Sequence, residues 1–274
     1  MFENKYYCLI AGLPDIVRDD TKVPVMIEEF KKELNLHLSN KDMRLVNLFF
    51  LERDNKSLIS LLRNESPVAD VLANYSIDFL ESQISSLDNI PSYMRSFISE
   101  FKDMAEMTSA SQENKLASYF FDFLLSTGNS FVSDYFEFEM NLRNLSIALN
   151  CRKYNRDIAS EIVGDNSFAI ALKSSKLKDF GLGDSYPYVE KVVSFFDSLS
   201  LTDKEREFDS LRWEFLDEKI TFKYFTIEVV VSYLVKLLII ERWSKLDSTR
   251  GKEIFNDLIK ELKNSFEFTE EYSV

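Results

Sequence analysis

The stretch that decides the fold runs from residue 134 to residue 153 and reads DYFEFEMNLRNLSIALNCRK. Its apolar residues recur at the i, i+4, i+7, i+11 spacing that puts side chains on one face of an α-helix; they are Phe138, Leu142, Leu145 and Leu149. Further apolar residues on either side widen this face. We therefore predict a helix that lies at the centre of a helical bundle.

The rest of the chain is poor in the residues that make tight turns. Its 274 residues include 6 glycines and 5 prolines, and sheet-rich folds need many turns built from these residues. The composition predicts an all-α fold, a multi-helix bundle with at most a short N-terminal strand. The strand candidate is the apolar run at residues 6–11, YYCLIA, which is equally compatible with the first turns of a helix.

The most apolar stretch, residues 225–240, contains several β-branched residues and is either a buried strand or a buried helix. Glu228, Ser232 and Lys236 are four residues apart, which places them on one narrow polar stripe of a helix. The stretch also falls short of the roughly 20 apolar residues that a membrane span needs. We predict a core helix.

Capping signals mark several expected helix starts, because the side chain of an N-cap residue accepts a hydrogen bond from the first turn. These signals are Ser39 with Asp42, Ser66 with Pro67, and Thr202 with Glu205. The C-terminal part is predicted to form two helices, at about residues 222–246 and 249–266.

Two stretches divide the chain into expected lobes. Residues 108–112 are small and polar, and residues 180–187 contain two glycines and a proline. The boundaries give an N-terminal helical lobe at 1–110, a central lobe at 111–180 and a C-terminal lobe at 181–274. One continuous domain is the alternative.

The charge and the cysteines exclude several classes of protein. A net charge of −13 repels phosphate backbones, which argues against nucleic-acid binding. Two cysteines are too few for a disulfide scaffold, and the N-terminal residues do not resemble a secretory signal. We expect a cytoplasmic protein with reduced thiols.

Residues that could carry catalysis are scarce. His37 is the one histidine, and neither a phosphate-binding G-x-x-x-x-G-K-[ST] loop nor a G-x-S-x-G elbow occurs. Carboxylates such as Glu137 and Glu139 are interpreted as a solvated helix face. We predict no catalytic, cofactor-binding or metal-binding residues, no cofactor, and a protein that is not an enzyme.

Several short motifs carry a resemblance to a known family. They are Asn-Leu-Arg-Asn-Leu at 141–145 followed by Arg152-Lys153, Tyr233-Leu234 with Ile240-Glu241-Arg242, the opening 6–14, and Leu-Arg-Trp-x-x-Leu-Asp at 211–217. The first two resemble the signature helices of the C-type subunit of V-type ATP synthases, the d-type subunit in eukaryotes. The last two resemble a bacterial family encoded in Bacteroidetes-type V-type ATP synthase operons.

The resemblance implies a non-catalytic subunit of a rotary V-type ATPase or ATP synthase that couples the central stalk to the membrane rotor ring. Its partners would be the other components of that complex, with no nucleic acid and no membrane span of its own. It would lie in the cytoplasm, peripherally at the cytoplasmic face of the inner membrane when assembled. A free-standing acidic helical adaptor between proteins is the alternative.

Six residues in these motifs are candidates for partner contacts or for organising the lobes; they are Arg143, Asn144, Arg212, Trp213, Arg242 and Trp243. Residues 212–217 and 242–247 both read R-W-x-x-L-D, but their flanks differ. We interpret the similarity as a coincidence.

Overall fold

The computed structural model describes residues 5–18, 20 and 22–266, and within them the side chains as far as residue 246. These residues form helices and no strand, so the predicted all-α fold is confirmed. The helices are α1 (Tyr7–Ala11), α2 (Ile27–His37), α3 (Asn40–Leu48), α4 (Leu51–Leu62), α5 (Ile77–Ser86), α6 (Ser92–Glu100), the 3-10 helix η1 (Phe101–Met104), α7 (Ser109–Leu125), α8 (Ser130–Lys153), α9 (Ser167–Ser174), α10 (Tyr188–Phe195), α11 (Leu201–Ile220) and α12 (Ile227–Phe266).

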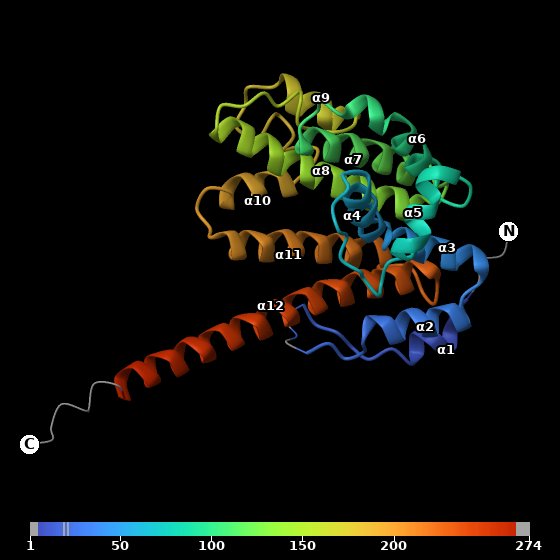
Figure 1. Ribbon diagram of the computed structural model, residues 1–274, viewed down its shortest axis with the longest axis vertical. Coiled ribbons are helices and arrows are strands. Elements are labelled where there is room, and N and C mark those ends of the chain that lie inside the picture. The colour runs from blue at the N-terminus through green and yellow to red at the C-terminus, as the bar shows by residue number, and fades with distance from the viewer. Residues whose placement is uncertain (1–4, 19, 21, 267–274) are drawn as a thin grey trace, which may run out of the picture.

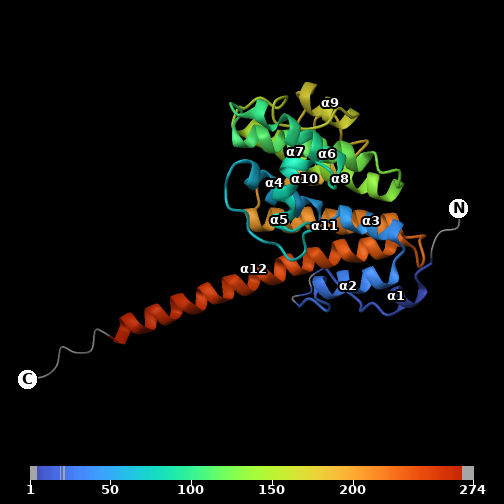
Figure 2. The same ribbon diagram turned by 45° about the vertical axis from the view of Figure 1, so that its right-hand side comes forward.

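The longest helix, α12, runs between α11 on one side and α1 and α2 on the other (Figure 1). Its first half packs against α11 and α2, while α6, α7 and α8 pack side by side on the far side of α11. The second half of α12 extends beyond the body, at the end opposite the α11–α12 loop, in both Figure 1 and Figure 2. A helix of 40 residues is about 60 Å long at 1.5 Å per residue.

Two apolar clusters form the core. The first cluster contains residues of helices α2 through α7 and of the start of α12. It includes the fully buried side chains of Phe30, Phe50 and Phe97. The second joins α8 to α9, α10 and α11. Helix α8 belongs to both, because Met140 lies in the first cluster and Leu142 in the second. Its predicted central position is confirmed, whereas the lobe boundaries at 110 and 180 stay a prediction.

Two local expectations are confirmed, and one open choice is resolved. The apolar stretch 225–240 is helical from Ile227 onward, as part of α12, although this helix begins later than the expected residue 222. Ser39 caps α3 by accepting a hydrogen bond from the Asp42 amide at 3.2 Å. The choice between a strand and a helix at the N-terminus is resolved, because residues 7–11 form the helix α1.

The predicted helix start at Ser66-Pro67 is wrong. Residues 66–76 form an irregular loop, and α5 begins at Ile77 after the capping residue Ser76. The buried carboxylate of Asp54 accepts hydrogen bonds from the backbone amides of Asn74 and Tyr75, at 2.9 and 3.0 Å. Tertiary contacts thus take the backbone donors that a local helix needs.

Two other boundaries also differ. Ser200, rather than Thr202, caps α11 by accepting from the Asp203 amide at 3.2 Å, so the helix starts two residues earlier than expected. The two predicted C-terminal helices are one continuous helix, because the polar residues 247–249 include no proline and have only moderately low helix propensity. The glycine-rich stretch 180–187 is an ordered turn that buries Phe180 and Leu182 in the second cluster.

Among the described residues, no helix combines the length and the apolar character that crossing a membrane requires.

Candidate functional site

A polar network centred on Asp209 joins three helices. Asp209 lies on α11 and its side chain is only 3% exposed. Its carboxylate accepts hydrogen bonds from Arg212 Nη1 at 3.1 Å, from the Trp243 indole N–H at 2.7 Å, and from Arg242 Nη2. The end of the packed part of α12 is therefore held to α11 by a buried charge.

Arg212 extends this network to α8. Its guanidinium binds Glu139 in a bidentate way, with Nε–Oε1 and Nη2–Oε2 distances of 2.7 and 3.0 Å. Glu139 also accepts a hydrogen bond from the Tyr135 hydroxyl at 2.7 Å. Bidentate pairs of this kind fix orientation as well as adding energy. Glu139 is thus part of a buried joint, and its assignment to a solvated helix face was wrong.

The titration behaviour follows from this geometry. Burial alone would lower the pKa of Arg212, but the charge and hydrogen bonds of Glu139 raise it above its ordinary value. Burial, followed by the Glu139 charge, also raises the pKa of the Tyr135 hydroxyl well above 10. Arg212 therefore remains a cation, and Tyr135 a neutral donor, throughout the physiological pH range.

The remaining tryptophan candidate lies next to the network. The Lys236 ammonium is 4.8 Å from the ring centroid of Trp213 and pairs with Asp217. Trp213 and Trp243 are both partly buried against the first apolar cluster. In the two R-W-x-x-L-D segments, Leu216 is fully buried whereas Leu246 is 52% exposed. The segments occupy different environments, which favours coincidence over a repeat.

Arg143 and Asn144 of α8 take no part in this network. Arg143 donates to the Asn114 side chain of α7 at 2.5 Å, and its Nη1 is buried without a hydrogen-bond partner among the described residues. Burial lowers the pKa of Arg143, although the charges of Glu113 and Glu161 oppose this. Asn144 is fully buried and bonds both the amide and the carbonyl of Val163, at 3.1 and 2.7 Å.

The structure thus brings three of the six candidates, Arg212, Arg242 and Trp243, onto one carboxylate. That carboxylate, Asp209, was not among the sequence candidates. Its spacing of three residues from Arg212 was the available signal, because residues i and i+3 share a helix face. Tyr135 carried no such signal, since its role depends on how α8 packs against α11.

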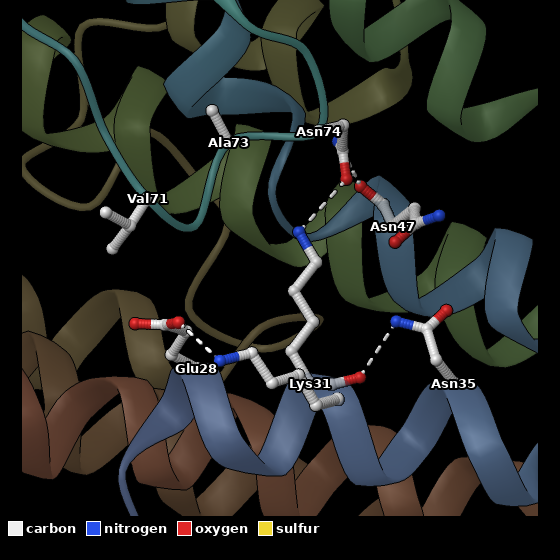
Figure 3. A pocket seen from close by; sticks show the side chains of 8 residues that line it. Glu28, Lys31, Asn35, Asn47, Val71, Ala73 and Asn74 are labelled. Carbon is white, nitrogen blue, oxygen red and sulfur yellow. Dashed lines mark hydrogen bonds and ion pairs between the residues drawn. The ribbon is translucent and has the colours of Figure 1, made fainter.

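An open cavity lies elsewhere, between α2 and the 70–75 loop, and has a volume of about 350 Å³. Figure 3 shows Lys31 crossing it toward Asn74. The ammonium donates to the Leu72 carbonyl at 2.8 Å and lies 4.0 Å from the ring centroid of Phe50. Burial lowers the pKa of Lys31. Glu28 contributes the one carboxylate among the lining residues.

Within the described residues, no group of three or more histidine, cysteine, aspartate or glutamate side chains has the geometry to hold a metal ion.

Comparison with known proteins gives one match. A family model described as "Protein of unknown function (DUF2764)" matches residues 3–266. The chain belongs to this family. No curated protein and no solved structure matches it. The DUF2764 match covers both apolar clusters and the Asp209 network, and the description of DUF2764 assigns no function.

Proposed function

We propose that this DUF2764 protein is a non-catalytic subunit of a V-type rotary ATPase or ATP synthase and that it couples the central stalk to the membrane rotor ring. One observation carries the proposal. The two helices with motifs similar to the V-type signature helices, α8 and α12, are tied through α11 by the chain Glu139–Arg212–Asp209–Arg242.

A component that couples stalk to ring must transmit torque without bending. Bidentate and buried ion pairs hold helices at a set orientation, and close-packed apolar interiors deform little under strain. The Asp209 network adds an electrostatic joint to the two apolar clusters, on the side of the body where α12 leaves it. This construction suits a rigid coupler.

The length of α12 supports the same function. Its first half is embedded in the body and its second half projects from it (Figures 1 and 2). One rigid helix therefore connects the body to a point well outside it. A protein that bridges two other components needs such separated contact points.

Affinity purification from native membranes tests the assignment. We expect a tagged, full-length chain to recover the catalytic-head and central-stalk proteins of a V-type ATPase from a gently solubilised complex. An untagged strain supplies the control for non-specific recovery. If the chain returns without any of these proteins while the complex itself is intact, the free-standing adaptor becomes the better proposal.

A charge reversal at Arg242 tests the role of the joint. In Arg242→Glu, a carboxylate faces Asp209 and also Glu205, which lies 3.9 Å from Arg242 Nη1. We expect ATP-driven ion pumping to fall more than ATP hydrolysis, because the joint between α11 and α12 loosens. Lys191→Glu is the matched control, since Lys191 forms an exposed pair with Glu214. Equal pumping in the two variants would argue against a coupling role for the joint.

A further inference from the structure

The loop between α11 and α12 exposes large aromatic side chains. Phe222 is 88% exposed and Tyr224 is 67% exposed, and Tyr7 of the neighbouring α1 is 57% exposed. We call these three residues the aromatic tip. A single exposed apolar residue needs no explanation, but several exposed aromatic side chains on adjoining segments indicate a surface that contacts another molecule.

Contacts between the N-terminal residues and the α11–α12 loop fix the backbone at the tip. The Tyr6 amide donates to the Phe225 carbonyl at 2.7 Å, and the ring centroids of Tyr7 and Phe225 are 4.7 Å apart. Phe225 has φ +57°, a left-handed conformation that is strained for a bulky side chain. The next residue, Thr226, is buried. The backbone is thus held in a costly conformation next to the exposed side chains of Phe222 and Tyr224.

The tip lies at one end of the α11–α12 helical hairpin. The projecting half of α12 lies at the other end of the same helix (Figures 1 and 2). The tip and the projecting half of α12 are therefore separated by the length of the body. In a bridging protein, they face different components.

The chemistry of the tip fits the headgroup region of a bilayer. In sequence order, Phe222 has an apolar side chain, Lys223 a cationic one and Tyr224 an amphipathic one. Tyrosine rings sit well where one end is apolar and the other wet, and lysine stems extend along apolar surface to keep the ammonium in water. The high exposure of Phe222 leaves it almost no contact with its own chain, a form that suits insertion into a soft interface.

The charge of the molecule agrees with this orientation. A net charge of −13 repels an anionic membrane surface as a whole. Two lysines lie next to the tip in the sequence: Lys223 stands between Phe222 and Tyr224, and Lys5 stands two residues before Tyr7. Lys223 Nζ is 3.7 Å from Glu228 Oε1, so the surface next to the tip does not share the strong negative charge of the whole chain. An exposed tip without this negative charge can reach the headgroups while the acidic body stays in water.

We propose that the aromatic tip inserts into the headgroup region of a lipid bilayer. The inference rests on the proposed function only for the identity of the membrane. It adds to the proposed function an assignment of which end of the molecule faces the bilayer.

Vesicle co-sedimentation of the purified full-length chain tests the inference. The vesicles are phosphatidylcholine alone and phosphatidylcholine mixed with phosphatidylglycerol. The test variant combines Phe222→Ser with Tyr224→Ser, and the control is Leu36→Ser, whose side chain on α2 is 82% exposed. We expect the double variant to lose about tenfold or more in partitioning, because two aromatic side chains no longer leave water. The control should partition like the unaltered chain.

Three outcomes would overturn the inference: no sedimentation of the unaltered chain with either vesicle, equal sedimentation of the double variant, or an equal loss in Leu36→Ser. Thermal unfolding followed by circular dichroism should be unchanged in both variants, since the replaced side chains are exposed. The vesicle assay contains no other ATPase component, so its failure leaves the co-purification result standing, and the reverse also holds.

Discussion

Replacing Arg212 by alanine is expected to lower the free energy of unfolding by about 3–5 kcal/mol, the usual cost of removing one partner from a buried ion pair. The change leaves Glu139 and Asp209, whose side chains are 18% and 3% exposed, without their shared cation. Each carboxylate then stays in a poorly hydrated site. Chemical denaturation followed by circular dichroism measures the change.

Two comparison variants help to interpret this loss: one separates the charge of Arg212 from its shape, and the other removes an exposed ion pair elsewhere. Arg212→Lys keeps a cation but loses the bidentate fork, so an intermediate loss of stability is expected. Lys191→Ala removes an exposed pair whose side chains are 58% and 54% accessible, and should change stability little. A loss in Arg212→Ala no greater than that in Lys191→Ala would show that the network does not hold α8 to α11.

The second large effect is expected at Asn144. Asn144→Ala removes both hydrogen bonds to Val163, which is itself buried. A buried N–H and a buried C=O then lack partners, at about 1–3 kcal/mol each, or about 2–6 kcal/mol together. The loop around residue 163 should also lose protection in amide hydrogen exchange.

Asn150→Ala is the matched control for this variant, because Asn150 lies on the same helix with an exposed side chain. It should leave stability and exchange near residue 163 unchanged. If Asn144→Ala behaves like Asn150→Ala, the two hydrogen bonds contribute no net stability, and Asn144 does not organise the packing of this loop on α8.

Asn144 and Arg212 show how much the sequence motifs predicted about the structural role of a residue. Asn144 and Arg212 both came from the motifs that carry the family resemblance, and both form buried contacts between elements. The sequence did not show which partner each one binds. Glu139 lies 73 residues from Arg212 in the chain, so the pair exists only because α8 and α11 pack side by side.

The irregular loop at 66–76 makes the same point for secondary structure. Serine followed by proline is a good local start for a helix. The structure nevertheless forms a loop here, in which the amide of Asn74 donates to Asp54, 20 residues before Asn74 in the chain. Local signals compete with tertiary hydrogen bonds, and here the tertiary contacts determine the conformation. At Ser39 the local capping signal was correct, because the Asp42 amide bonds the Ser39 hydroxyl as the motif predicts.

What the sequence determined by itself was the helical class, the buried helix at 134–153 and the helical form of the stretch beginning near residue 225. These follow from periodicity and turn composition, which act over a few residues. Only the tertiary structure decided which charges meet at Asp209, that α12 is one helix extending past the body, and that Phe222 and Tyr224 are exposed. Each depends on which elements pack together, and packing joins residues that are far apart in the chain.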